Sequence, residues 1–116
     1  MARHGMDSID KRGSARLPIR TAVRYEINGE MTAGRGFDLS ENGIGFTGSR
    51  LSPVGATLKI EFQMNSSHAE WFRVKGVVRR SAQDRMGVEF LNIGPAVKTQ
   101  ILKAIYHELA IQRRQA

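Results

Sequence analysis

Apolar and polar residues alternate along much of this chain, in short runs that end at glycine, asparagine or proline. The clearest run covers residues 19–27, where every second residue is apolar or a threonine. A period of two is typical of a strand with one buried face. Asn28-Gly29 follows directly and favours a two-residue hairpin, because both positions tolerate positive φ.

Five further strands are predicted along the chain. We expect them at residues 31–40, 44–47, 57–64, 71–80 and 86–91. The first of these contains Gly34 and Gly36, which favour a bulge or bend of the kind that turns a barrel corner. The pattern therefore predicts an all-β domain of six antiparallel strands that close into a small barrel.

The period changes after Gly94-Pro95. From there the apolar residues recur at the three- and four-residue spacing of an amphipathic helix: Val97, Ile101, Leu102, Ile105 and Leu109. Proline suits the first helical position because its missing amide hydrogen is not needed there. We expect this stripe to cover an open end of the barrel, since about two heptads make a poor coiled coil.

The chain thus divides into three segments. We expect a flexible N-terminal arm over residues 1–17, which show no periodic apolar pattern, a β-barrel over 18–93 and a C-terminal helix over 94–116. The 116 residues are 41% hydrophobic, enough for one modest core. Cysteine is absent, which excludes a disulfide framework and a thiolate metal site. The apolar runs are short, so we expect neither a signal peptide nor a membrane span, and a cytoplasmic location.

Positive charge is concentrated at the N-terminal end. The net charge is +7, and residues 1–24 contain six Lys or Arg against Asp7 and Asp10, which gives +4. A basic segment attracts polyanions such as nucleic acid, a phospholipid surface or a phosphorylated small molecule. Charge alone does not choose among these partners.

Two short motifs narrow the choice. Arg12 and Arg16 lie four residues apart in the basic segment, and Asp38, Ser40 and Gly43 follow further along the chain. An arginine fork can contact O6 and N7 of guanine together and can stack on a purine. A carboxylate can accept the N–H groups of guanine's Watson–Crick edge, a serine can reach a phosphate or base oxygen, and a glycine lets the backbone come close. The second motif on its own would also suit a tight turn.

Taken together, the two motifs resemble the paired signature of PilZ domains, R-x-x-x-R followed by [DN]-x-S-x-x-G. PilZ domains are receptors for the bacterial second messenger cyclic di-GMP, and the resemblance covers about residues 10–93. It implies a PilZ-type barrel, with the two arginines gripping the ligand from the arm and the second motif forming the barrel side. It also implies a non-enzymatic receptor or adaptor without a cofactor. Its arm would change conformation on binding cyclic di-GMP and would signal to an unidentified protein partner.

Four further residues are candidates for ligand contact. Lys11 precedes the first motif, and in the family a basic residue there favours a stacked pair of ligands over one. Asn42 stands where the family often has glycine, and asparagine also tolerates positive φ. Arg79, with its neighbour Arg80 as the alternative, and Trp71 are the others, although a cross-strand pair with Glu89 would suit the arginine better and packing would suit Trp71 better.

Other functions have weaker support. Residues 43–48 match the dinucleotide fingerprint G-x-G-x-x-G, but that motif needs a following helix and a strand is predicted here. The three histidines have no metal-ligand spacing, and nothing in the sequence suggests a hydroxyl nucleophile with a base partner. We therefore expect neither an enzyme nor a metal site.

The alternative is a small nucleic-acid-binding barrel of the oligonucleotide-binding or cold-shock kind, because the chain is basic and β-rich. Such sites interleave exposed aromatic residues with basic ones. Five of the aromatic residues fall on positions that we assign to the core: Tyr25, Phe37, Phe46, Phe62 and Phe90. Nucleic acid is therefore not the expected partner. An adaptor that has lost its ligand is a third class, and the intact motifs argue against it.

Overall fold

The computed structural model describes residues 16–63 and 71–115. The strands are β1 (Arg16–Ile27), β2 (Glu30–Ser40), β3 (Gly43–Gly48), β4 (Thr57–Phe62), β5 (Phe72–Ala82) and β6 (Arg85–Leu91), and the helix is α1 (Pro95–Gln115). The six strands and the C-terminal helix confirm the predicted fold class.

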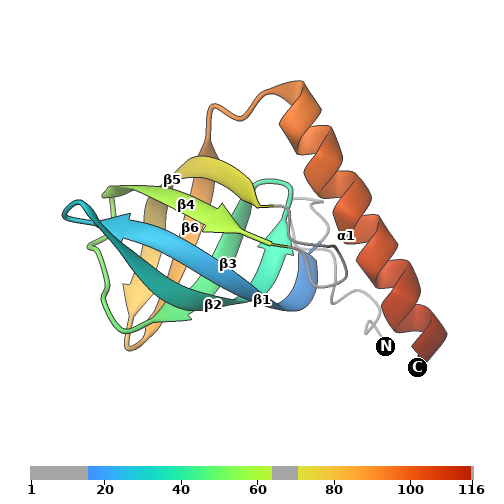
Figure 1. Ribbon diagram of the computed structural model, residues 1–116, viewed down its shortest axis with the longest axis horizontal. Helices are drawn as coiled ribbons and strands as arrows, with labels where there is room; N and C mark the ends of the chain where they lie inside the picture. Colours follow the sequence, from blue (N-terminus) through green and yellow to red (C-terminus); the bar gives the residue numbers. More distant parts are fainter. Residues whose placement is uncertain (1–15, 64–70, 116) are drawn as a thin grey trace.

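The strands close into a barrel in which all neighbouring pairs are antiparallel (Figure 1). Their order around the barrel is β1-β2-β3-β6-β5-β4. This order places β2, β3 and β6 on one wall and β1, β4 and β5 on the opposite wall. The ladder between β1 and β4 is short, with residues 23–25 opposite residues 60–62.

One hydrophobic core fills the barrel, with side chains from alternate positions of all six strands. Tyr25 is fully buried, and its hydroxyl donates a hydrogen bond to the backbone carbonyl of Arg50 at 2.7 Å, so its polar end is satisfied. Phe46 packs on Tyr25 with ring centroids 4.9 Å apart, and Phe62 stacks on Phe90 at 5.9 Å. Four of the five aromatic residues that we assigned to the core lie in it.

The fifth, Phe37, lies on the outside of the barrel, so its assignment to the core was wrong. Counting back by twos from the buried Leu39 places Phe37 inside. The register of β2 against β3 shifts between Gly36 and Asp38, however, and Phe37 is the extra residue at this irregularity. An inserted residue moves its neighbours to the other face of the strand. The bulge predicted from the two glycines of β2 is therefore present, and it turns Phe37 outward.

Helix α1 lies across one end of the barrel (Figure 1). Ile101 and Ile105 are fully buried members of the core, and the partly buried helical residues that pack against it are Val97, Ala104 and Leu109. The helix contacts β1 and β2. The predicted position of the helix over the barrel end is confirmed, and so is the apolar stripe except for Leu102, which is not among the residues that pack against the core. Among the described residues, no helix has the length and apolar content that crossing a membrane would take.

Most strand bounds differ from the prediction by one to three residues. β1 begins at Arg16, two residues inside the segment that we assigned to the arm, because this residue pairs with the end of β2. The strand expected over residues 57–64 ends at Phe62. The rest of the expected arm, residues 1–15, lies outside the described residues.

Candidate ligand-binding site

Strand pairing brings Arg16, the last residue of the first motif, next to the second motif. Arg16, at the start of β1, is opposite Ser40 at the end of β2, and Ser40 is in turn opposite Gly43 at the start of β3. The second arginine of the first motif therefore lies one strand away from the serine of the second motif. The predicted contacts Lys11 and Arg12 lie outside the described residues.

The second motif holds the turn between β2 and β3. The backbone N–H of Asn42 donates to Ser40 Oγ at 3.1 Å, and the N–H of Phe90 in β6 donates to the Asn42 carbonyl at 2.8 Å. Ser40 is only 5% exposed, so its hydroxyl serves the turn and keeps one hydrogen to donate. Asn42 is not among the positive-φ residues of the described segments. We gave the tolerance of asparagine for positive φ as the reason for this residue, but the backbone at Asn42 does not require it.

Gly43 allows two strands to approach closely. A Cβ built at this position would lie 2.3 Å from the backbone carbonyl oxygen of Val88 in β6, far inside van der Waals contact. The φ of Gly43 is not in the left-handed region, so space and not backbone conformation requires the glycine. This residue keeps the turn of the second motif against β6.

Phe37 and Asp38 close over Gly45 on the outer face of β3. A Cβ at Gly45 would lie 2.8 Å from two carbons of the Phe37 ring and 3.0 Å from Asp38 Oδ1. Because Gly45 has no side chain, the ring and the carboxylate can lie against the strand. Asp38 is half-buried beside the ring, and an ionised carboxylate there can accept two N–H groups from the edge of a base.

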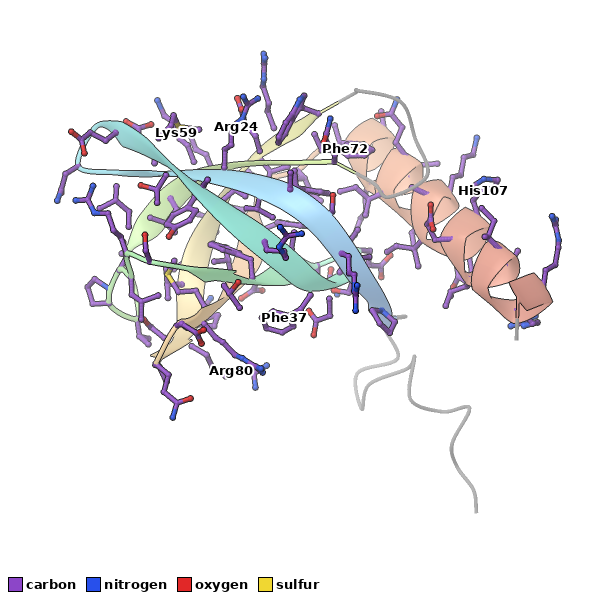
Figure 2. All side chains as sticks on the ribbon, turned by 60° about the horizontal axis from the view of Figure 1, so that its bottom comes forward. Arg24, Phe37, Lys59, Phe72, Arg80 and His107 are labelled. Atoms are coloured by element: carbon purple, nitrogen blue, oxygen red, sulfur yellow. The ribbon has the colours of Figure 1, made fainter. Side chains whose placement is uncertain are left out.

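Two arginines continue this surface onto β5 and β6. Gly87 is opposite Gly45, and the Arg80 side chain lies over it, with Cβ and Nε each 3.7 Å from the position that a Gly87 Cβ would take. The Arg85 guanidinium carbon lies 5.1 Å from the centroid of the Phe37 ring, within cation–π range. Figure 2 shows Phe37 and Arg80 on the same side of the barrel.

We call the area formed by Phe37, Asp38, Arg80 and Arg85 the Phe37 surface. Among these four, sequence reasoning predicted Asp38 and named Arg80 only as an alternative to Arg79. Glycines at positions 43, 45 and 87 are a signal that could have indicated the rest, since Gly45 and Gly87 face each other across β3 and β6. Two facing residues without side chains leave room for flat groups from the strands on either side.

The two remaining candidates have other contacts. Arg79 Nε donates to Glu89 Oε1 at 2.7 Å, which is the cross-strand pair that suited it in the sequence. Trp71 precedes β5 on the opposite wall, and the Arg24 guanidinium carbon lies 3.8 Å from its ring centroid. Figure 2 shows Arg24 on the side of the barrel opposite to Phe37. Contact of Arg79 or Trp71 with a ligand stays a prediction.

The chemistry of the Phe37 surface suits a flat, anionic heteroaromatic ligand. An aromatic ring and two guanidinium groups provide stacking and positive charge, and the carboxylate provides directional acceptors. In the described segments no group of three or more His, Asp or Glu side chains could hold a metal ion. The flat base, the N–H donors and the negative charge of a purine nucleotide match the aromatic ring, the carboxylate and the guanidinium groups.

Comparison with known proteins identifies the family. The sequence matches the family model of the PilZ domain over residues 10–107. No curated protein matches it. Bacillus subtilis inhibitor of motility (MotI/DgrA) is 20% identical with a TM-score of 0.72, and the match covers 88% of this chain and 52% of that one. Escherichia coli YcgR in complex with c-di-GMP is 19% identical with a TM-score of 0.79, and the match covers 91% of this chain and 49% of that one. The PilZ domain of YcgR with c-di-GMP is 18% identical with a TM-score of 0.71, and the match covers 91% of this chain and 97% of that one.

The chain thus spans about half the length of the first two proteins and matches almost all of the isolated PilZ domain. At these identities the structural matches establish the fold. The family model covers most of the sequence, including both motifs and all six strands. This chain therefore belongs to the PilZ domain family.

Proposed function

We propose that this chain is a non-enzymatic receptor for cyclic di-GMP. The observation that carries the proposal is the pairing of Arg16 with Ser40, which brings the second arginine of the first motif beside the serine of the second motif, two residues along β2 from Asp38 of the Phe37 surface. Two structures of one similar protein, Escherichia coli YcgR and its isolated PilZ domain, contain c-di-GMP, which supports the same ligand class here.

Each part of the ligand has a complementary group. Asp38 accepts the N–H groups on the Watson–Crick edge of one guanine, and the Phe37 ring with the neighbouring Arg80 and Arg85 provides a flat, cationic surface for the base. Arg12 and Arg16 contact guanine O6 and N7 or a phosphate through their forked N–H donors. The two phosphates carry the negative charge that this basic region attracts.

We further propose that ligand binding draws the N-terminal segment onto the barrel and that this change signals to a protein partner. Arg16 is held in β1, whereas Arg12 precedes the strand, so a ligand bound by both arginines connects the segment to the barrel wall. Amide hydrogen exchange with and without c-di-GMP tests this step. We expect increased protection over residues 10–15, and unchanged exchange there would contradict this output while leaving the receptor proposal in place.

Isothermal titration calorimetry with c-di-GMP tests the receptor itself. We expect saturable binding, with affinity reduced about tenfold or more by Arg16→Ala and by Asp38→Asn, because each change removes one strong polar contact to a base. Arg113→Ala is the matched control, since it removes an exposed arginine from the last turn of α1. If the folded, unaltered protein releases no heat and shows no change in its amide spectrum with c-di-GMP, the receptor proposal is wrong.

A further inference from the structure

The wall opposite the Phe37 surface carries an ordered row of charged side chains. Arg24 in β1, Glu61 in β4 and Arg73 in β5 are directly opposite one another. Both arginines bind the same carboxylate: Arg24 Nη2 lies 2.8 Å from Glu61 Oε1, and Arg73 Nε lies 3.1 Å from Glu61 Oε2. Glu61 therefore holds the two guanidinium groups in place on the surface.

A second charged row lies beside the first. Lys59 is opposite Lys75, and Lys59 Nζ is 3.9 Å from Glu26 Oε1. The two rows together hold four cations and two carboxylates, a net charge of +2. The cations face the solvent more than the carboxylates do, since the side chains of Arg73 and Lys59 are 76% and 68% exposed and those of Glu61 and Glu26 are 21% and 32% exposed. The wall thus presents positive charge outward.

Trp71 and Arg24 form a rigid pair at the edge of the first row. The Arg24 guanidinium carbon lies 3.8 Å from the centroid of the Trp71 ring, and Arg24 Nε is fully covered without a hydrogen-bond partner among the described residues. Stacking and the ion pair to Glu61 hold this guanidinium in one position. A partner that contacts it loses little conformational entropy, and tryptophan and arginine are the residues most enriched at binding hot spots.

A hollow of about 360 Å³ extends this wall from β5 to the start of α1. Arg73 and Lys75 lie at its rim, and its apolar lining consists of Val74, Leu91, Ile93 and Val97. Arg73 belongs both to the rim of the hollow and to the Arg24–Glu61 row. Positive charge and an apolar depression are therefore continuous on this wall.

We propose that the outer face of β1, β4 and β5 is a docking surface for an acidic segment of a protein partner. The segment places carboxylates against Arg73 and the Trp71–Arg24 pair, and one of its apolar side chains enters the hollow beside α1. Figure 2 shows Arg24 and Lys59 on the side of the barrel opposite to Phe37 and Arg80. A docked partner and a nucleotide on the Phe37 surface can therefore occupy the barrel together, and the docking surface does not depend on the proposed ligand.

The charge pattern favours a protein over a nucleic acid. Glu61 and Glu26 alternate with the cations in both rows, so the wall offers separate cationic points and not the continuous positive groove that follows a nucleic-acid backbone. A protein segment can place individual carboxylates at such points. Single-stranded nucleic acid also requires several stacking rings, and Trp71 is the only tryptophan in the chain.

The fluorescence of Trp71 tests this proposal because no other tryptophan contributes to it. The probe is a short synthetic peptide of glutamate and aspartate with a central leucine. We expect a saturable change in fluorescence that weakens as salt is added. Arg73→Glu should lower the peptide affinity about tenfold or more, whereas Arg113→Glu, the same charge change at the end of α1, should alter it by less than about threefold.

Three results would overturn the docking surface: no saturable change in fluorescence, equal losses for Arg73→Glu and Arg113→Glu, or tighter binding of an oligothymidylate than of the peptide. A peptide with serine in place of leucine should bind more weakly, and equal affinity would contradict the role of the hollow. Circular dichroism verifies that each variant is folded. Titration of Arg73→Glu with c-di-GMP separates the two proposals, because we expect its nucleotide affinity to be unchanged. Failure of the unaltered protein to bind c-di-GMP would refute the receptor and leave the peptide result standing.

Discussion

At the scale of single residues, two glycines of β3 differ in what a side chain would meet. A Cβ at Gly45 would press on the side chains of Phe37 and Asp38, which lie on the outer surface and can move. A Cβ at Gly43 would meet the backbone carbonyl of Val88, which is fixed in the ladder between β3 and β6.

We predict different consequences for alanine at these two positions. Gly43→Ala should lower the free energy of unfolding by about 1–3 kcal/mol, because the strands must separate to admit the methyl group. Gly45→Ala should cost less stability but should displace the Phe37 ring and weaken c-di-GMP binding. Urea unfolding and calorimetry on both variants check this. A Gly45→Ala protein with unchanged affinity would show that the Phe37 ring does not contact the ligand.

Phe37 also shows where sequence reasoning stops at the residue scale. The two glycines of β2 predicted an irregularity, but not which residue it would turn outward, because that depends on the register against β3. Asp38, Ser40 and Gly43 were predicted from their resemblance to the second PilZ motif, whose residues lie close together in the sequence. Arg85 was not predicted and Arg80 was named only as an alternative to Arg79, since both join this surface through the pairing of β6 with β3 and of β5 with β6.

At the scale of elements, the sequence pattern predicted individual strands and a hairpin, which depend on neighbouring residues. The alternation of apolar residues in β1, β4 and β6 was sufficient to predict three strands, and the Asn28-Gly29 hairpin has the expected positive φ values of 52° and 82°. The pairing of β3 with β6 and of β1 with β4 joins segments far apart in the chain. No local period encodes these neighbours, so the two walls of the barrel emerged only from the structure.

The helix offers a sharp test at this scale because neighbouring positions have opposite environments. Ile105 is fully buried and Tyr106 is 58% exposed. Ile105→Ala should lower the free energy of unfolding by about 2–5 kcal/mol, since it removes core contacts and leaves a cavity at the end of the barrel. Tyr106→Ala should change it by less than about 0.5 kcal/mol. Urea unfolding of both variants makes the comparison, and equal losses would contradict the packing of α1 on the barrel.

At the scale of the whole molecule, the closed barrel separates two binding chemistries. The wall of β2, β3 and β6, together with Arg80 near the end of β5, combines an aromatic ring, a carboxylate and arginines, whereas the β1–β4–β5 wall carries rows of ion pairs with an excess of cations. Both walls contribute to the net charge of +7, and that charge alone would attract any polyanion. The affinity for a nucleotide could therefore come mainly from the contacts of the two motifs or mainly from the positive charge of the entire surface.

Salt dependence answers this question. A protein that contacts 6–10 phosphates of DNA loses about 10³–10⁵ in affinity between about 50 and 200 mM salt, because counterions are released on binding. Cyclic di-GMP has only two phosphates, so we expect a loss of about tenfold over the same range, with directional contacts supplying the remaining affinity. Calorimetry with c-di-GMP and with an oligothymidylate at both salt concentrations provides the comparison. A c-di-GMP affinity that falls as steeply as that of the oligonucleotide would mean that the positive field, and not the paired motifs, holds the ligand.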